Sequence, residues 1–231
     1  MKKFIHESIN LGYSDLESET TETGRRYVLP NGKSYPSVTT VLSILNEDSI
    51  QSWRRKVGEE EANKISHQAA SRGTTVHATI EKYLNNNSDY LEGLMPHVID
   101  NFRTIQNILD ENLGKIFALE VPLYSDHLTL AGRVDCIAEW NGKISVIDFK
   151  TSRKIKSKEY IQNYFIQESA YAIMWEERTG VPITQLVTVI AGDEGSQIFV
   201  EHRDNHTKKL LETINEYNRR RFFGNTSKTC R

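Results

Sequence analysis

Cysteine is nearly absent from this chain of 231 residues, because only Cys136 and Cys230 occur and they form no CxxC pair. A disulfide framework, a zinc ribbon and a four-cysteine iron–sulfur cluster are therefore excluded. Proline and glycine are also few, at 5 and 13 residues, which excludes collagen-like and low-complexity classes. Since no apolar run approaches 18 residues, we expect no membrane-spanning segment and no membrane partner.

Targeting signals and an excess of basic charge are lacking as well. His6 and Glu7 interrupt the short apolar start, and residues 1–24 contain no arginine. We therefore expect neither a signal peptide nor a transit peptide, and a cytoplasmic location in a bacterial or phage-infected cell. The formal net charge of −2 gives no global basic surface for nucleic acid. Local basic clusters at 54–56 and 153–158 fit either a solvated surface or a nucleic-acid contact.

The periodicity of apolar residues predicts one α/β domain over residues 31–231. The first 30 residues are polar and aperiodic, and we predict a poorly ordered arm there. Helical spacing dominates a predicted helical part over 36–114, with its longest helix over 59–84. Alternating spacing begins a predicted sheet core over 115–231, with strands expected at 116–124, 128–140, 143–151, 184–191 and 196–201 and helices at 157–178 and 205–221.

A predicted β-hairpin carries the charged residues of greatest interest. A two-residue turn at Asn141-Gly142 is the strongest short hairpin signal, and it places Asp135 opposite Asp148 and Arg133 opposite Lys150. Like charges that face each other destabilise a sheet unless something binds between them. A divalent cation such as Mg²⁺ is the obvious ligand. The alternative is a buried network in which Asp148 pairs with Lys150 or Arg133.

Several short motifs around this hairpin together resemble a known enzyme family. They are Gly132-x-x-Asp135, Asp148-Phe149-Lys150, Arg72-Gly73-Thr74-x-x-His77, Gln167-x-x-Ala170-Tyr171, Pro36-Ser37-Val38-Thr39-Thr40 and Glu120-Val121-Pro122. The set resembles the PD-(D/E)xK nuclease superfamily in its RecB-type exonuclease branch, and in particular the mitochondrial genome maintenance exonucleases and their phage relatives. The resemblance covers about residues 35–202. It implies an α/β restriction-endonuclease-like core, with a central mixed five-stranded sheet flanked by helices and a helical N-terminal extension.

The resemblance also implies a metal centre and its ligands. His77, Asp135, Asp148 and the backbone carbonyl of Phe149 would hold Mg²⁺, with Mn²⁺ as an effective substitute because one ligand is an imidazole. Lys150 would orient or deprotonate the attacking water and offset charge in the transition state. Members with an iron–sulfur cluster use four cysteines, so we expect no such cluster. No G-x-x-x-x-G-K-[ST] motif occurs, so we expect no ATP site.

The role of Glu120 depends on the register of its strand. A four-residue connection at 125–128 would pair it with Arg133 and place it on the acidic face as a further catalytic carboxylate, whereas a slip of one residue removes it. The resemblance implies a second set of residues that contact DNA, and the alternative for them is helix capping or a polar helix edge. This set is Ser37, Thr39, Thr40, Arg72, Thr74, Gln167 and Tyr171.

The function expected from these residues is metal-dependent hydrolysis of DNA phosphodiester bonds. We expect an exonuclease that acts on single-stranded DNA or DNA ends during processing, repair or recombination, with replication or recombination proteins as further partners. The alternatives are a structure-dependent or site-specific endonuclease on the same fold, and a DNA-binding module that has lost catalysis. The presence of Asp135, Asp148, Lys150 and His77 speaks against the last, since an inactive module has no use for these charges.

Overall fold

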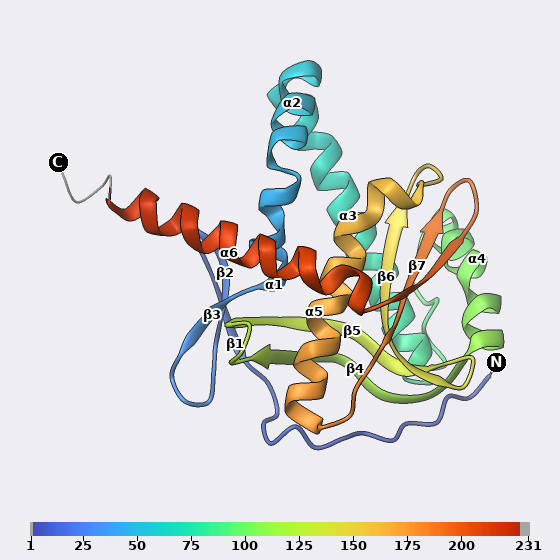
Figure 1. Ribbon diagram of the computed structural model, residues 1–231. Coiled ribbons are helices and arrows are strands. Elements are labelled where there is room, and N and C mark those ends of the chain that lie inside the picture. Colours follow the sequence, from blue (N-terminus) through green and yellow to red (C-terminus); the bar gives the residue numbers. More distant parts are fainter. Residues whose placement is uncertain (1, 227–231) are drawn as a thin grey trace.

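A mixed sheet of five strands, in the order β4-β5-β6-β7-β8, forms the centre of the fold in the computed structural model (Figure 1). The structure describes residues 2–226, so Cys230 lies outside the described part of the chain. β6 and β7 are parallel and the other neighbouring strands are antiparallel. The strands are β4 (Leu113–Ser125), β5 (Leu130–Trp140), β6 (Lys143–Ser152), β7 (Gln185–Gly192) and β8 (Gln197–His202). The predicted α/β architecture is confirmed.

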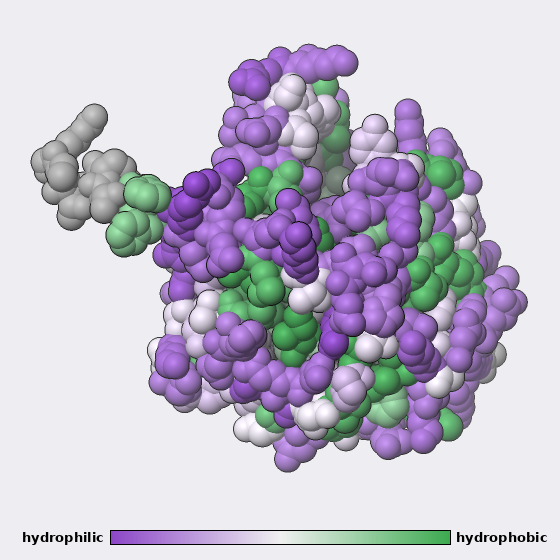
Figure 2. Space-filling model, in the orientation of Figure 1, coloured by the Kyte–Doolittle hydropathy of each residue, from purple (hydrophilic) through white to green (hydrophobic). Residues whose placement is uncertain are grey.

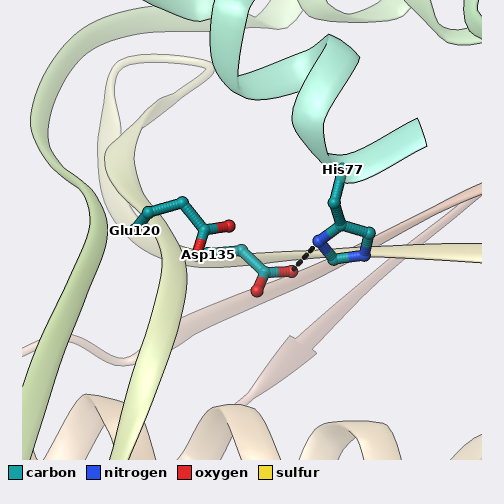
Figure 3. Close-up of side chains that lie close together, drawn as sticks. All are labelled: His77, Glu120 and Asp135. Carbon is teal, nitrogen blue, oxygen red and sulfur yellow. Dashed lines mark ion pairs between the residues drawn. The ribbon is translucent and has the colours of Figure 1, made fainter. Parts of the chain in front are cut away.

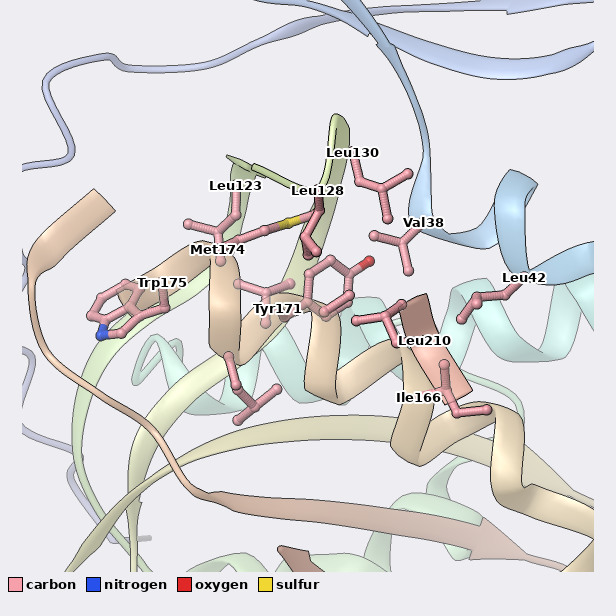
Figure 4. Packing of buried hydrophobic residues seen from close by; sticks show 14 of the residues in the cluster. Val38, Leu42, Leu123, Leu128, Leu130, Ile166, Tyr171, Met174, Trp175 and Leu210 are labelled. Atoms are coloured by element: carbon pink, nitrogen blue, oxygen red, sulfur yellow. The ribbon is translucent and has the colours of Figure 1, made fainter. Parts of the chain in front are cut away.

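Helices cover both faces of this sheet, and each face has its own hydrophobic core. On one face, α3 and α4 pack over a cluster that includes Trp140, Ile147 and Phe149. On the other face, Val38 of α1, Tyr171 of α5 and Leu210 of α6 belong to the second cluster (Figure 4). This cluster also includes Ile137 and Val146 of the sheet. The helices are α1 (Val38–Leu42), α2 (Glu47–Val57), α3 (Glu59–Leu84), α4 (Pro96–Asn112), α5 (Gln162–Thr179) and α6 (Asp204–Thr226), with 3₁₀ turns η1 (Ser43–Leu45) and η2 (Lys158–Ile161).

The predicted register of the β5–β6 hairpin is confirmed as far as its backbone ladder extends. The Asn141-Gly142 turn pairs Trp140 with Lys143, and the same register continues to Cys136 opposite Ile147. Asn141 and Gly142 both have positive φ, at 52° and 76°, as a type I′ turn requires. Asp135 and Asp148 therefore lie just beyond the pair Cys136–Ile147, at the end of the hairpin farthest from its turn.

A helical hairpin of α2 and α3 projects from the body of the protein (Figure 1). No residue of α2 is buried, and the part of α3 nearest to it is also largely exposed. The turn between the two helices is Gly58, at φ 88°, and Arg54 pairs with Glu59 across it. Figure 2 shows this projection as mainly hydrophilic. The opposite end of α3 buries Val76 and Ile80 against the sheet, so one helix links the projection to the core.

The N-terminal residues differ from the poorly ordered arm that the sequence predicted over 1–30. Phe4 is buried in the α3–α4 core, and the amide of Glu7 donates to the carbonyl of Ile116 at 2.8 Å. Further along, β1 (Glu17–Thr21), β2 (Gly24–Val28) and β3 (Ser34–Pro36) form a small antiparallel sheet. The apolar residues of this segment are too far apart to give a helical or alternating pattern. The sequence therefore did not predict that the segment packs against the rest of the protein. No helix in the described residues is both long and apolar enough to cross a membrane.

Candidate active site

Three potential metal ligands converge from three different elements (Figure 3). His77 comes from α3, Glu120 from β4 and Asp135 from β5. One ligand atom of each residue lies within 4.8 Å of the other two, and Nδ1 of His77 is 3.7 Å from Oδ2 of Asp135. The structure thus brings His77 and Asp135 together, as the resemblance implied, and adds Glu120 to them.

Glu120 reaches this cluster through a register that the sequence did not predict. The chain turns at 126–129, and Pro122 instead of Glu120 faces Arg133. Glu120 falls between the pairs Leu119–Cys136 and Val121–Val134, level with Asp135. Its φ of 52° is rare for a residue with a side chain. The expected pairing with Arg133 is therefore wrong, while the expected position on the acidic face agrees with the structure.

Burial and neighbouring charge keep a proton on Glu120 more readily than on an ordinary carboxylate. Desolvation, followed by repulsion from Asp135 and Glu81, raises the pKa of Glu120 to about 7. A cation placed among the three ligand atoms would relieve this repulsion. One imidazole and two carboxylates form a donor set that suits Mg²⁺ or Mn²⁺. The residues present therefore fit a divalent cation.

Asp148 and Lys150 form a second group beside this cluster. Asp148 is only 1% exposed; its Oδ2 pairs with the Lys150 ammonium and its Oδ1 accepts a hydrogen bond from Nε2 of Gln167 at 2.9 Å. Burial raises the pKa of Asp148 to about 6, although Lys150 opposes that shift. For Lys150, burial lowers the pKa, but attraction to Asp148 and Asp135 prevails and raises it overall. The lysine therefore remains an ammonium at neutral pH.

Asp135 and Asp148 have different partners in the structure, and a metal-ligand role for Asp148 stays a prediction. Oδ2 of Asp135 accepts a hydrogen bond from the backbone amide of Phe149 at 2.9 Å, which fixes this carboxylate toward His77 and Glu120. Asp148 is instead held by Lys150 and Gln167. Both interpretations of the hairpin therefore have a counterpart in the structure. Asp135 belongs to a cluster of potential cation ligands, and Asp148 forms a buried ion pair with Lys150. The side chain of Phe149 is buried in the core, and a ligand role for its carbonyl stays a prediction.

The residues predicted to contact DNA occupy three different settings. Gln167 lies at the site through its bond to Asp148. Tyr171 is only 3% exposed and lies within the α5 core (Figure 4). Arg72 lies on α3 with its guanidinium 3.1 Å from Asp193, and the Thr74 hydroxyl donates to the carbonyl of Ala70 at 3.1 Å. A DNA contact by any of them stays a prediction.

The Ser37 group forms a helix cap. The Ser37 hydroxyl accepts a hydrogen bond from the Thr40 amide at 3.0 Å and lies 3.0 Å from the Thr39 hydroxyl. The Thr40 hydroxyl in turn accepts from the amide of Arg25 at 3.0 Å. Ser37 is 2% exposed whereas Thr39 is exposed. These contacts match the capping alternative that the sequence left open.

One buried acid beside the site had no sequence signal. Glu168 is fully buried on α5 and accepts a hydrogen bond from the Thr188 hydroxyl. Within residues 2–226, its Oε2 atom has no hydrogen-bond partner. Thr188 is the neighbour of Asp148 in the parallel ladder. Desolvation, with repulsion from Asp148, raises the pKa of Glu168 well above its ordinary value. Because glutamate is common on helices, its place next to Gln167 in the chain gave no reason to single it out.

Comparisons with known proteins identify the family of this chain. The family model for the PD-(D/E)XK nuclease superfamily matches residues 87–231. Mitochondrial genome maintenance exonuclease 1 of Mus musculus is 28% identical over 202 residues, covering 80% of this chain and 59% of the mouse protein. The protein of the same name from Xenopus tropicalis is 26% identical over 215 residues, covering 84% of this chain and 60% of the frog protein. The chain therefore spans about 60% of the length of these two relatives.

A solved structure shows a weaker likeness. The crystal structure of SSO0001 is 15% identical in sequence, with a TM-score of 0.33, over 62% of this chain and 71% of that chain. A score this low carries no argument about the site. The family match spans β4, β5, β6 and α5, and so includes Glu120, Asp135, Asp148 and Lys150, whereas His77 precedes it.

Proposed function

Because the chain belongs to the PD-(D/E)XK nuclease superfamily, we propose that it is a metal-dependent DNA exonuclease that acts on single-stranded DNA or DNA ends. The convergence of His77, Glu120 and Asp135 next to a buried Asp148–Lys150 pair carries this proposal. The curated relatives bear the name exonuclease, which supports hydrolysis from an end. Work in DNA processing, repair or recombination is part of the same proposal.

Each residue of the site has a distinct part in the proposed reaction. His77, Glu120 and Asp135 would hold Mg²⁺, or Mn²⁺ in its place. The ion supplies polarisation of a phosphoryl oxygen and a more acidic bound water. The amide of Phe149 fixes the Asp135 carboxylate, which limits the motion of one ligand.

Lys150 contributes positive charge in this proposal. Its raised pKa keeps the ammonium protonated, so it orients the attacking water and offsets the negative charge that develops on the phosphoryl group. Asp148 and the bond from Gln167 hold the ammonium in place.

A single-stranded oligodeoxynucleotide labelled separately at each end tests the proposal. We expect the wild-type protein to release the label with Mg²⁺ or Mn²⁺ and not with EDTA, and the label released first gives the polarity. Lys150→Ala should reduce the rate by about 100-fold or more. The control Lys143→Ala changes an exposed lysine at the other end of the same strand and should keep the wild-type rate.

Further variants and substrates separate the alternatives. His77→Ala leaves the Asp148–Lys150 pair intact, so its loss of cleavage cannot be attributed to an unpaired buried charge. A wild-type rate for Lys150→Ala would refute its assigned role. Cleavage of circular single-stranded DNA would identify an endonuclease, and retention of DNA without cleavage in either metal would identify a binding module.

A further inference from the structure

A groove on the surface shares one wall residue, Tyr164, with the surroundings of Lys150. It has a volume of about 650 Å³ and runs between the first residues of α2 and the segment 154–164. Tyr164 is in its wall, and the Lys150 ammonium lies 5.2 Å from the centroid of that ring. Tyr164 therefore adjoins both the groove and the proposed catalytic lysine, which gives a chain bound at the active site a route into the groove.

Tyr160 presents an aromatic ring at this groove. The residue is 83% exposed, while the next residue, Ile161, is 1% exposed and packs with Phe165 and Ile190. The amide of Tyr160 donates to the carbonyl of Ser157 at 3.1 Å. The backbone of Tyr160 is thus anchored while its ring faces solvent. An exposed ring on an anchored turn contributes little to folding and is available to stack on a ligand.

Two lysines supply positive charge to the same groove. Lys154 and Lys156 line it and are exposed, and neither forms an ion pair with any residue between 2 and 226. Lys158, by contrast, is paired with Glu201. The backbone of Lys156 is fixed by two hydrogen bonds of 2.8 Å with the side chain of Gln197. Among the described residues that line the groove there is no aspartate or glutamate, so it complements an anionic ligand.

We propose that this groove binds the single-stranded DNA next to the phosphate at the active site, with Tyr160 stacked on a base and Lys154 and Lys156 on phosphates. Inside a duplex both faces of each base are covered by neighbouring base pairs, whereas a single strand exposes its bases along its length for stacking on an aromatic ring. The groove would therefore select single strands over duplex DNA. The inference deepens the proposed function and rests on it, since it assigns the substrate chemistry of that site.

Binding in EDTA tests the groove without cleavage. A fluorescent oligodeoxythymidylate is titrated with the full-length protein at several salt concentrations. Tyr160→Ala should weaken binding at least about fivefold, because stacking on one base is lost, and should leave the salt dependence unchanged. Tyr160→Phe keeps the ring and should restore wild-type affinity.

The double variant Lys154→Ala/Lys156→Ala should make the slope of log K against log salt shallower by about 1.4, as two lost phosphate contacts on a single strand predict. Lys143→Ala is the matched control and should leave affinity and slope unchanged.

The outcomes distinguish the groove from the proposed function. If wild type cleaves DNA while Tyr160→Ala binds normally and the double variant keeps the wild-type slope, the groove assignment is overturned and the nuclease stands. If these variants lose affinity as expected but no metal supports cleavage, the groove stands and the proposed activity fails. Equal affinity of the wild type for a duplex of the same length would overturn the inferred preference for single strands.

Discussion

Glu168→Gln should make the protein more stable than wild type, by an amount that increases with pH. In the native state Glu168 is fully buried, and its Oε2 atom has no hydrogen-bond partner among the described residues. Desolvation and repulsion from Asp148 raise its pKa well above the ordinary value. Unfolding exposes this group to water, where it ionises near pH 4.3. Its stabilising contribution is fully present below that pH and is lost as the pH rises toward the native pKa. Glutamine has nearly the same shape and does not ionise. The free energy of unfolding of the variant should therefore not show this decrease with pH.

The size of the effect follows from the proton balance. Each pH unit between the unfolded and the native pKa costs the wild type about 1.4 kcal/mol of unfolding free energy. The free energy of unfolding of the variant should therefore rise relative to that of wild type as the pH increases from 5 toward the native pKa of Glu168. Each kcal/mol of this difference corresponds to about 2–4 °C in Tm for a domain of this size. Asp148 and Glu120 also have raised pKa values, and both proteins retain these groups. Because Glu168 and Asp148 repel each other, replacing Glu168 should also lower the pKa of Asp148, which changes the difference in the same direction.

Urea denaturation of both proteins at pH 5, 6 and 7 measures this difference. The free energies of unfolding should diverge steadily with pH. Glu212→Gln, on the exposed side of α6, is the matched control and should follow the wild-type curve. Parallel curves for wild type and Glu168→Gln would refute the reasoning, because they would mean that Glu168 ionises in the native state as readily as in water.

Two further predictions concern the neighbourhood of the site. Gly132→Ala should destabilise the protein by about 1–3 kcal/mol in urea denaturation, because the new Cβ would lie 2.8 Å from Cε1 of the Tyr171 ring. Unchanged stability would show that Tyr171 and α5 can shift to accommodate the methyl group without cost. Affinity for Mn²⁺, measured by calorimetry, should fall as the pH drops from 8 to 6, since Glu120, with a pKa of about 7, must lose its proton to bind the ion. Glu120→Gln should weaken binding and flatten this pH dependence, and a pH dependence as steep as that of wild type would contradict the assignment of Glu120 as a ligand.

Local chemistry made part of the fold predictable from sequence. The Asn141-Gly142 turn has one favoured geometry, and it fixed the pairing of β5 with β6 as far as Cys136 and Ile147. The longest predicted helix, over 59–84, has the bounds of α3, because its buried positions repeat at helical spacing along its core half. The placement of Asp135 next to His77 came from the family resemblance, since no local pattern links residues so far apart in the chain.

The parts that sequence did not predict depend on long-range packing. The connection between β4 and β5 includes Thr129 at φ 54°, and threonine gives no warning of a positive φ, so the register of Glu120 could not be read from the chain. Glu168 stands on a helix like any solvated glutamate, and only the packing of α5 on β7 buries it. Phe4 is a single apolar residue in a polar stretch, and its pocket is built by α3 and α4.

Because Glu120 has a positive φ, selection for stability and selection for activity should favour different residues at this position. A residue with a side chain pays about 1–3 kcal/mol to hold such a conformation, whereas glycine adopts it freely. A library screened only for thermal resistance should therefore enrich glycine at position 120. A library screened for DNA turnover should retain glutamate, because the same backbone twist directs its carboxylate toward His77 and Asp135. The residue recovered at this one position would report which property a screen had rewarded.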